Sequence, residues 1–172
     1  TYTLALSSTP HTINFTGPCE GDFSSNELVY SDSPSDSYWG TKNELHNLWI
    51  SFDKDNLYLG LSGILEGNSL IVYFDCGDYF GSIEDASSLP WSSARNHKFP
   101  ASFKPDYQFI SWNFSAGNFY RILSTTSISD ITSDVSQKTR GSYGNLSNIE
   151  IKIPFSVFYE GIAGSGIPGG AE

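Results

Sequence analysis

Apolar and polar residues alternate with a period of two through most of the chain. Residues 48–53 and 57–61 each carry an apolar side chain at every second position, and Lys54, Asp55 and Asn56 lie between them. Two alternating segments joined by a short Asp/Asn turn are typical of a β-hairpin. The pattern therefore predicts two antiparallel strands here, each with one buried face.

Other segments show the same periodicity, and only residues 156–161 suggest a single helical turn. Residues 69–75 are apolar at both alternating positions, which predicts a strand in the middle of a sheet with both faces covered. Pro154 has no N–H group, so we expect it to end the last ladder. Such spacing predicts an all-β fold, an antiparallel β-sandwich of jelly-roll or immunoglobulin-like type. The remaining predicted strands are residues 1–6, 12–15, 107–114, 118–124 and 148–153.

Two long irregular stretches, residues 22–44 and 77–105, interrupt these strands. Loops of that length in a compact domain are usually functional. The chain has 172 residues, which suits one domain. We expect residues 1–10 to form an N-terminal arm or edge strand and residues 11–172 to form a single β-sandwich domain.

The charge balance restricts the partners of this domain. Nine basic and 19 acidic residues give a net charge of −10, which argues against nucleic acid and anionic membranes as partners. No apolar run approaches the ~20 residues of a membrane span. Met is absent, Lys is scarce and there is no charged-then-apolar leader, so we expect a secreted or cell-surface protein whose signal peptide has been removed.

Two cysteines and three glycosylation sequons bear on this extracellular interpretation. Cys19 and Cys76 are expected to form one disulfide, with two buried free thiols as the alternative. Closing that loop would stabilise the fold by about 4 kcal/mol. The sequons at Asn14, Asn113 and Asn145 permit N-glycosylation of a secreted chain.

Motifs for catalysis are weak. No Ser has Gly at both −2 and +2, and His11, His46 and His97 have no second His or Cys at metal-ligand spacing. Residues 164–169 match GxGxxG but precede no helix, so we expect no nucleotide. The acidic residues can supply a pair of catalytic carboxylates, but no pattern locates the pair. We therefore expect a protein that is not an enzyme.

Calcium is the candidate metal. Asp75 and Asp78 flank the point where a predicted strand enters the second long stretch, and Ca²⁺ takes carboxylate and carbonyl oxygens from such loops. Ordinary Asp-rich turns are the alternative at this position. The hairpin turn explains the other acidic cluster, at residues 53–56.

The chain is rich in aromatic residues, with four Trp, ten Tyr and 12 Phe. Aromatic planes stack on the apolar faces of sugar rings, while basic and amide side chains bind the hydroxyl groups. Trp39 and Trp91 lie in the long irregular stretches, Arg95 and Lys98 follow Trp91, and Trp112 is on a predicted strand. These residues are the candidate sugar site; the alternative is that the tryptophans fill the core.

The order of several motifs resembles the family 9-like carbohydrate-binding domains, which are DOMON-like β-sandwiches of secreted glycoside hydrolases and surface proteins. Phe23 stands where the family pattern has Trp. The resemblance spans about residues 13–167. The similar motifs are INFTG at 13–17 ahead of Asp22, LWISFDKDNLYLGL at 48–61, SLIVYFD at 69–75, Trp91, Arg95 and Phe99 with PDY at 105–107, and IEIKIP at 149–154.

The resemblance implies a noncatalytic extracellular module that binds a polysaccharide or cell-surface glycan. Related sandwiches hold haem, but we expect none here because haem ligation uses Met or His and the chain has no Met. The alternative is a structural subunit of an extracellular filament or surface layer. Residues 1–6 are uncharged and alternating, and could complete a neighbour's sheet by strand addition.

Overall fold

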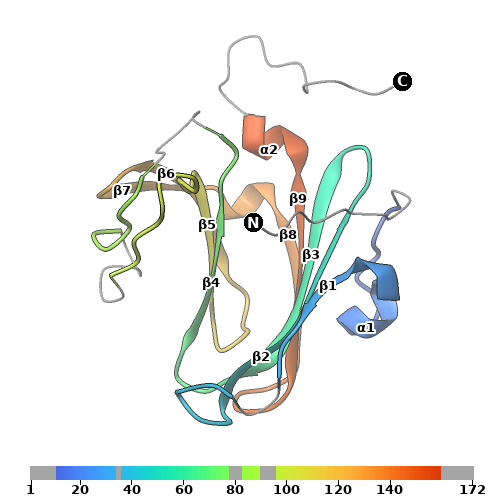
Figure 1. Ribbon diagram of the computed structural model, residues 1–172. Coiled ribbons are helices and arrows are strands. Elements are labelled where there is room, and N and C mark those ends of the chain that lie inside the picture. Colours follow the sequence, from blue (N-terminus) through green and yellow to red (C-terminus); the bar gives the residue numbers. More distant parts are fainter. Residues whose placement is uncertain (1–10, 34–35, 78–82, 90–95, 160–172) are drawn as a thin grey trace.

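The computed structural model describes residues 11–33, 36–77, 83–89 and 96–159. These residues form two antiparallel sheets packed face to face (Figure 1). One sheet has the order β1–β2–β3–β9–β8 and the other β4–β5–β6–β7, which confirms the predicted all-β sandwich. The strands are β1 (Leu28–Ser31), β2 (Asn43–Phe52), β3 (Asn56–Leu65), β4 (Ser69–Phe74), β5 (Tyr107–Trp112), β6 (Asn118–Ser124), β7 (Ser127–Asp130), β8 (Ser136–Arg140) and β9 (Ser147–Pro154).

The core lies between the sheets and is built by the predicted alternation. Successive side chains of a strand point to opposite faces, so every second residue of β3, β5 and β9 enters the core. The predicted hairpin is β2 and β3, which pair from Asn43 with Leu65 to Phe52 with Leu57. The fully or almost fully buried core residues include Leu59, Leu61, Tyr107, Phe109, Phe119, Ile149, Ile151 and Ile153.

One end of the sandwich, which we call the closed end, carries the β2–β3 turn and helix α2 (Phe155–Tyr159). Val157 and Phe158 of α2 are buried, and the Tyr107 hydroxyl donates to their carbonyl oxygens at 3.0 and 3.2 Å. The helix thus covers this end of the core.

The opposite end, which we call the aromatic end, carries the start of β2 and the β3–β4, β5–β6 and β8–β9 turns (Figure 1). Antiparallel pairing brings these four connections together because alternate turns of a meander lie on the same side. Segments far apart in the sequence therefore meet there.

The expected central position of β4 is wrong, because β4 is an edge strand that pairs only with β5 in its sheet. Its outer face is nevertheless apolar because part of the second long stretch folds over it. The Tyr73 ring lies 4.8 Å from the Phe99 ring, and Ile83, Ala86 and Leu89 are buried in the same cluster. Both faces of β4 are therefore covered, as the pattern predicted, but the strand lies at the edge of its sheet and not in the middle.

Two further expectations change and one is confirmed. Residues 12–15 form no strand; they lead into the short helix α1 (Cys19–Asp22), which packs outside the first sheet (Figure 1). Pro154 ends β9 as expected, and it pairs with Asn56 there. Strands β1, β7 and β8 were not predicted, since they are short and have little apolar alternation.

The predicted disulfide is also corrected: Cys19 and Cys76, which are both described, are free thiols. Cys19 is buried with Phe23 and Trp49 on the outer face of the first sheet, whereas Cys76 packs against the core between the sheets. The sheet separates them, so no bond can form. Burial raises the pKa of both thiols, that of Cys76 to about 12, which makes them poor nucleophiles.

Candidate functional site

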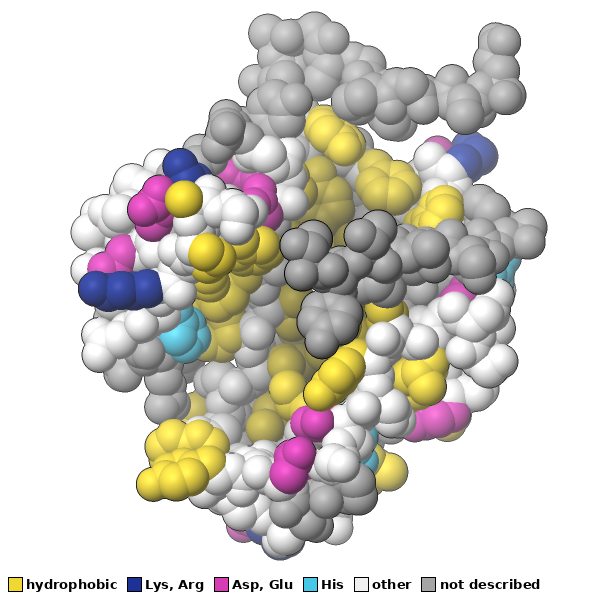
Figure 2. All heavy atoms as spheres, in the orientation of Figure 1, with side chains coloured by type: hydrophobic (Ala, Val, Ile, Leu, Met, Phe, Trp, Pro, Cys, Tyr) yellow, Lys and Arg dark blue, Asp and Glu magenta, His cyan; other side chains and the backbone are white. Residues whose placement is uncertain are grey.

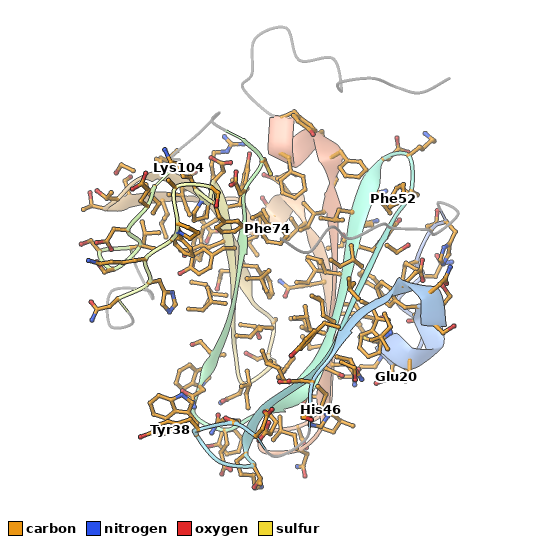
Figure 3. All side chains as sticks on the ribbon, in the orientation of Figure 1. Glu20, Tyr38, His46, Phe52, Phe74 and Lys104 are labelled. Atoms are coloured by element: carbon orange, nitrogen blue, oxygen red, sulfur yellow. The ribbon has the colours of Figure 1, made fainter. Side chains whose placement is uncertain are left out.

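Exposed aromatic side chains gather at the aromatic end. Tyr38 is 95% exposed, Trp39 70%, Tyr143 58% and Trp112 46%. Figure 3 shows Tyr38 at this end, and in the space-filling view a group of large hydrophobic side chains projects there at the lower left (Figure 2). Large apolar side chains that gather at one exposed place are typical of an interaction site.

Trp39 lies at a cavity of about 380 Å³, which we call the Trp39 cavity. Its polar lining comes from Asn43, Asn68, Ser69 and His97, and leucine and isoleucine side chains supply the rest. The His97 Nδ1 atom lies 2.7 Å from the Tyr73 hydroxyl, which fixes the ring. A mostly apolar cavity with a few polar groups, of this size, is suited to a small ligand.

The loop that carries Trp39 is held from below by a buried acid. The backbone N–H of Ser37 donates to Oε1 of Glu44 at 3.1 Å, and the N–H of Trp39 donates to the Ser37 hydroxyl oxygen at 3.1 Å. Glu44 is only 3% exposed. The Tyr38 and Trp39 rings pack edge to face, 5.9 Å apart. These contacts hold the backbone of Trp39 in place, although its ring is exposed.

Three asparagines join the turns of the aromatic end. Oδ1 of Asn43 accepts hydrogen bonds from Nδ2 of Asn68 at 2.7 Å and from the N–H of Glu66 at 3.2 Å. Oδ1 of Asn113 accepts from the N–H groups of Gly67 and Asn68 at 2.8 and 3.3 Å. These neutral amides fix the β3–β4 turn between β2 and the β5–β6 turn.

Trp112 lies at a second cavity of about 410 Å³, the Trp112 cavity, between the β5–β6 and β8–β9 turns. Tyr143, Ser142, Ser115 and Thr139 also line it. Trp112 is directly opposite Ser69 in the β4–β5 ladder, and Ser69 lines the Trp39 cavity. Opposite residues of a ladder are about 5 Å apart between Cα atoms, so Trp112 lies next to a residue of the Trp39 cavity.

Sequence reasoning found Trp39 and Trp112, and the structure places both at the aromatic end. Lys98 follows His97 of the Trp39 cavity in the sequence but lines neither cavity. Its Nζ atom lies 3.8 Å from a carboxylate oxygen of Asp85. Trp91 and Arg95 lie outside the described residues. Asn43, Asn68 and Tyr143 were missed, because isolated polar or aromatic turn residues carry no sequence signal.

Asp75 of the predicted calcium pair is part of a loop connection. Its carboxylate oxygens accept the N–H groups of Gly77 and Lys104, both at 2.9 Å. Asp78 lies outside the described residues. Within the described ranges, no group of three or more His, Cys, Asp or Glu side chains is placed to hold a metal ion. Calcium binding stays a prediction.

Among the described carboxyl groups, that of Glu150 has the largest pKa shift, and the residue lines neither cavity itself. Burial raises the pKa of Glu150 to about 7, against the lowering effect of the Arg140 guanidinium, and nearby Asp22 raises it further. Glu150 pairs with Arg140, which also donates to the Phe15 carbonyl oxygen at 2.8 Å. This group thus attaches the segment before α1 to the first sheet.

The sequons differ in their surroundings. Asn14 is exposed near α1, whereas Asn113 and Asn145 lie in turns of the aromatic end. Nδ2 of Asn145 donates to the Ser142 hydroxyl oxygen at 3.0 Å, and Ser147 of the same sequon is buried. Glycosylation of all three asparagines stays a prediction.

Comparisons with known proteins give no relative: no protein-family model matches the chain, and no curated protein or solved structure does either. The resemblance to family 9-like carbohydrate-binding domains therefore stays a prediction. Among the described helices, none has the length and apolar character needed to cross a membrane.

Proposed function

We propose that this protein is a noncatalytic, extracellular carbohydrate-binding β-sandwich whose sugar ligand stacks on the exposed tryptophan of the Trp39 cavity. The observation that carries the proposal is the position of Trp39: it is 70% exposed, held by its own loop, and placed beside a cavity lined by Asn43, Asn68 and Ser69.

The chemistry of the lining favours a sugar over other small ligands. A pyranose ring presents apolar C–H faces to an indole and hydroxyl groups to amides and hydroxyls, which is the combination found here. Among the described residues, no Lys or Arg lines the Trp39 cavity, and the chain has a net charge of −10. Phosphorylated and nucleic-acid ligands would be repelled.

The experiment is a glycan array probed with the intact protein at a concentration that detects millimolar binders. We expect binding to one class of neutral glycan, and weaker signals for Trp39→Ala. A matched control is Tyr30→Ala, which removes another exposed aromatic ring, 59% exposed on β1, away from both cavities. An array with no bound glycan would contradict the proposal.

Strand addition is the second candidate function, and it concerns residues 1–6, which lie outside the described residues. The nearest described residue favours pairing within the chain instead: the N–H of His11 donates to the carbonyl oxygen of Phe52, at the end of the chain's own β2, at 3.2 Å. Deletion of residues 1–8 tests it by light scattering. A smaller oligomer would support assembly, and an unchanged oligomeric state and stability would refute it.

A further inference from the structure

The β5–β6 turn has an unusual backbone conformation. Asn113 and Phe114 have φ angles of 54° and 55°, in the left-handed region. Asn tolerates this region, whereas an aromatic residue such as Phe rarely adopts it, and such strained residues cluster at functional sites. Phe114 is only 3% exposed, so packing in the core maintains the conformation.

Hydrogen bonds hold the same turn from both sides. The N–H of Asn113 donates to the Asn68 carbonyl oxygen at 3.0 Å, and its Oδ1 accepts from the β3–β4 turn. The N–H and hydroxyl of Ser115 both donate to the Trp112 carbonyl oxygen, at 2.9 and 2.5 Å. The result is a fixed turn whose Trp112 ring is 46% exposed. The turn is held in place although the Trp112 ring that it carries is not packed in the core.

The Trp112 cavity and the Trp39 cavity have separate linings, but residues of the two linings are direct neighbours. Ser69 faces Trp112 across the ladder and lines the Trp39 cavity, and Asn68 of that cavity is hydrogen bonded to Asn113 of the other. Both cavities are open to solvent. Each alone has the volume of a small-ligand site, so both together fit a ligand with several sugar units.

The lining also restricts the charge of this ligand. Among the described residues that line the Trp112 cavity, Arg140 is the basic one. Its guanidinium is paired with Glu150 and donates to the Phe15 carbonyl oxygen. A cation already neutralised by a buried carboxylate is a weak partner for an acidic sugar, and the acidic chain repels one at long range.

We propose that the Trp39 and Trp112 cavities are two subsites of one binding site, and that its ligand is an uncharged linear polysaccharide bound along its length instead of at a chain end. This inference rests on the proposed function. The strained turn serves to present Trp112 to the sugar units that follow those on Trp39.

Calorimetric titration tests the inference with neutral gluco-, xylo-, manno- and galacto-oligosaccharides of two and six units. In the series that binds, we expect the six-unit ligand to bind at least about 10-fold more tightly than the two-unit ligand, because it stacks on a second aromatic ring. Trp112→Ala should remove this difference. Reduction of the terminal aldehyde should leave the affinity unchanged.

Leu123→Ala is the matched control, because Leu123 is 52% exposed on β6 and lines neither cavity. Equal affinities for two and six units, an unchanged six-unit affinity in Trp112→Ala, or loss of binding after reduction would each overturn the inference while leaving sugar binding in place. Absence of binding by every oligosaccharide and by the array polymers would overturn the proposed function itself.

Discussion

The two ends of the sandwich use aromatic residues in opposite ways. At the closed end, Tyr107, Phe119 and Phe158 are 0%, 0% and 5% exposed, and their rings pack 5.3–6.5 Å apart beneath α2. At the aromatic end, Trp39 and Trp112 are 70% and 46% exposed. In Figure 3, Phe74 lies between the sheets while Tyr38 is at the outer end of its loop. An aromatic-rich composition thus fills the core at one end and leaves exposed rings at the other, where we propose that the ligand binds.

The ends also differ in the groups that hold their turns. Asp53 closes the β2–β3 turn, where its carboxylate accepts the N–H groups of Asp55 and Asn56 at 2.8 Å and the Tyr58 hydroxyl at 2.6 Å. At the aromatic end, the β3–β4 and β5–β6 turns are held by the carboxamides of Asn43, Asn68 and Asn113, which do not titrate, while the acid Glu44 holds only the loop of Trp39. Acid should therefore loosen the β2–β3 turn of the closed end and leave the amide contacts of the aromatic end unchanged.

The largest effect is expected from Phe119→Ala. Removal of this fully buried ring, which contacts Tyr107, Phe74 and Phe158, should lower the free energy of unfolding by about 3–5 kcal/mol. Urea unfolding measures it. Leu123→Ala on the same strand should change stability by no more than about 0.5 kcal/mol. Equal losses in both variants would break the comparison between buried and exposed residues.

A smaller effect is expected from Asn113→Ala. It removes the acceptor for two backbone N–H groups and places Ala at a φ of 54°, so stability should fall by about 1–3 kcal/mol. Asn113→Gly relieves the backbone but not the lost bonds, and Asn113→Asp keeps the acceptor while removing the sequon. Thermal unfolding should show the largest loss of stability for Asn113→Ala, a smaller one for Asn113→Gly and the smallest for Asn113→Asp. If Asp were as unstable as Ala, the acceptor role would be refuted.

The pH dependence of stability should come in part from Asp53. Burial works to raise the pKa of this carboxyl, but the hydrogen bonds from Tyr58, Asp55 and Asn56 outweigh it and lower the pKa from 3.8 to about 2. A lowered folded-state pKa means that the stabilisation is complete above pH 3.8 and is lost as the pH falls through 2. Asp53→Asn should flatten this acid loss in urea titrations between pH 4 and 2. The same slope in both proteins would contradict the assignment.

Much of the fold was predictable because apolar alternation survives wherever one face of a strand enters the core. Strands β6 and β9 follow from it almost to the residue. The β2–β3 hairpin follows from it near the turn, but β2 begins five residues earlier and β3 ends four residues later than the alternation of 48–53 and 57–61 indicated. The edge position of β4 was not predictable, since the apolar pattern of residues 69–74 reports that both faces of the strand are covered and not how many strands flank it. Strand β8, with the sequence SQKTR, is recognisable only from its pairing with β9.

The candidate site was predictable only in its aromatic residues. An indole in a Gly- and Ser-rich loop stands out in a sequence, so Trp39 could be named. The asparagines that build the floor of the site come from residues 43, 68 and 113, and they meet because three turns converge. The failed disulfide has a similar cause: which side of the sheet Cys19 occupies depends on the path of residues 13–23 around it.

The most direct measurement is affinity electrophoresis in gels containing the glycan polymer identified on the array, comparing the intact protein with Trp39→Ala and Tyr30→Ala. Stacking on an exposed indole predicts that Trp39→Ala weakens binding by about 1–3 kcal/mol while its melting temperature stays that of the intact chain. Tyr30→Ala should migrate as the intact protein does. Equal retardation of all three proteins, with all three folded, would contradict sugar binding at the aromatic end.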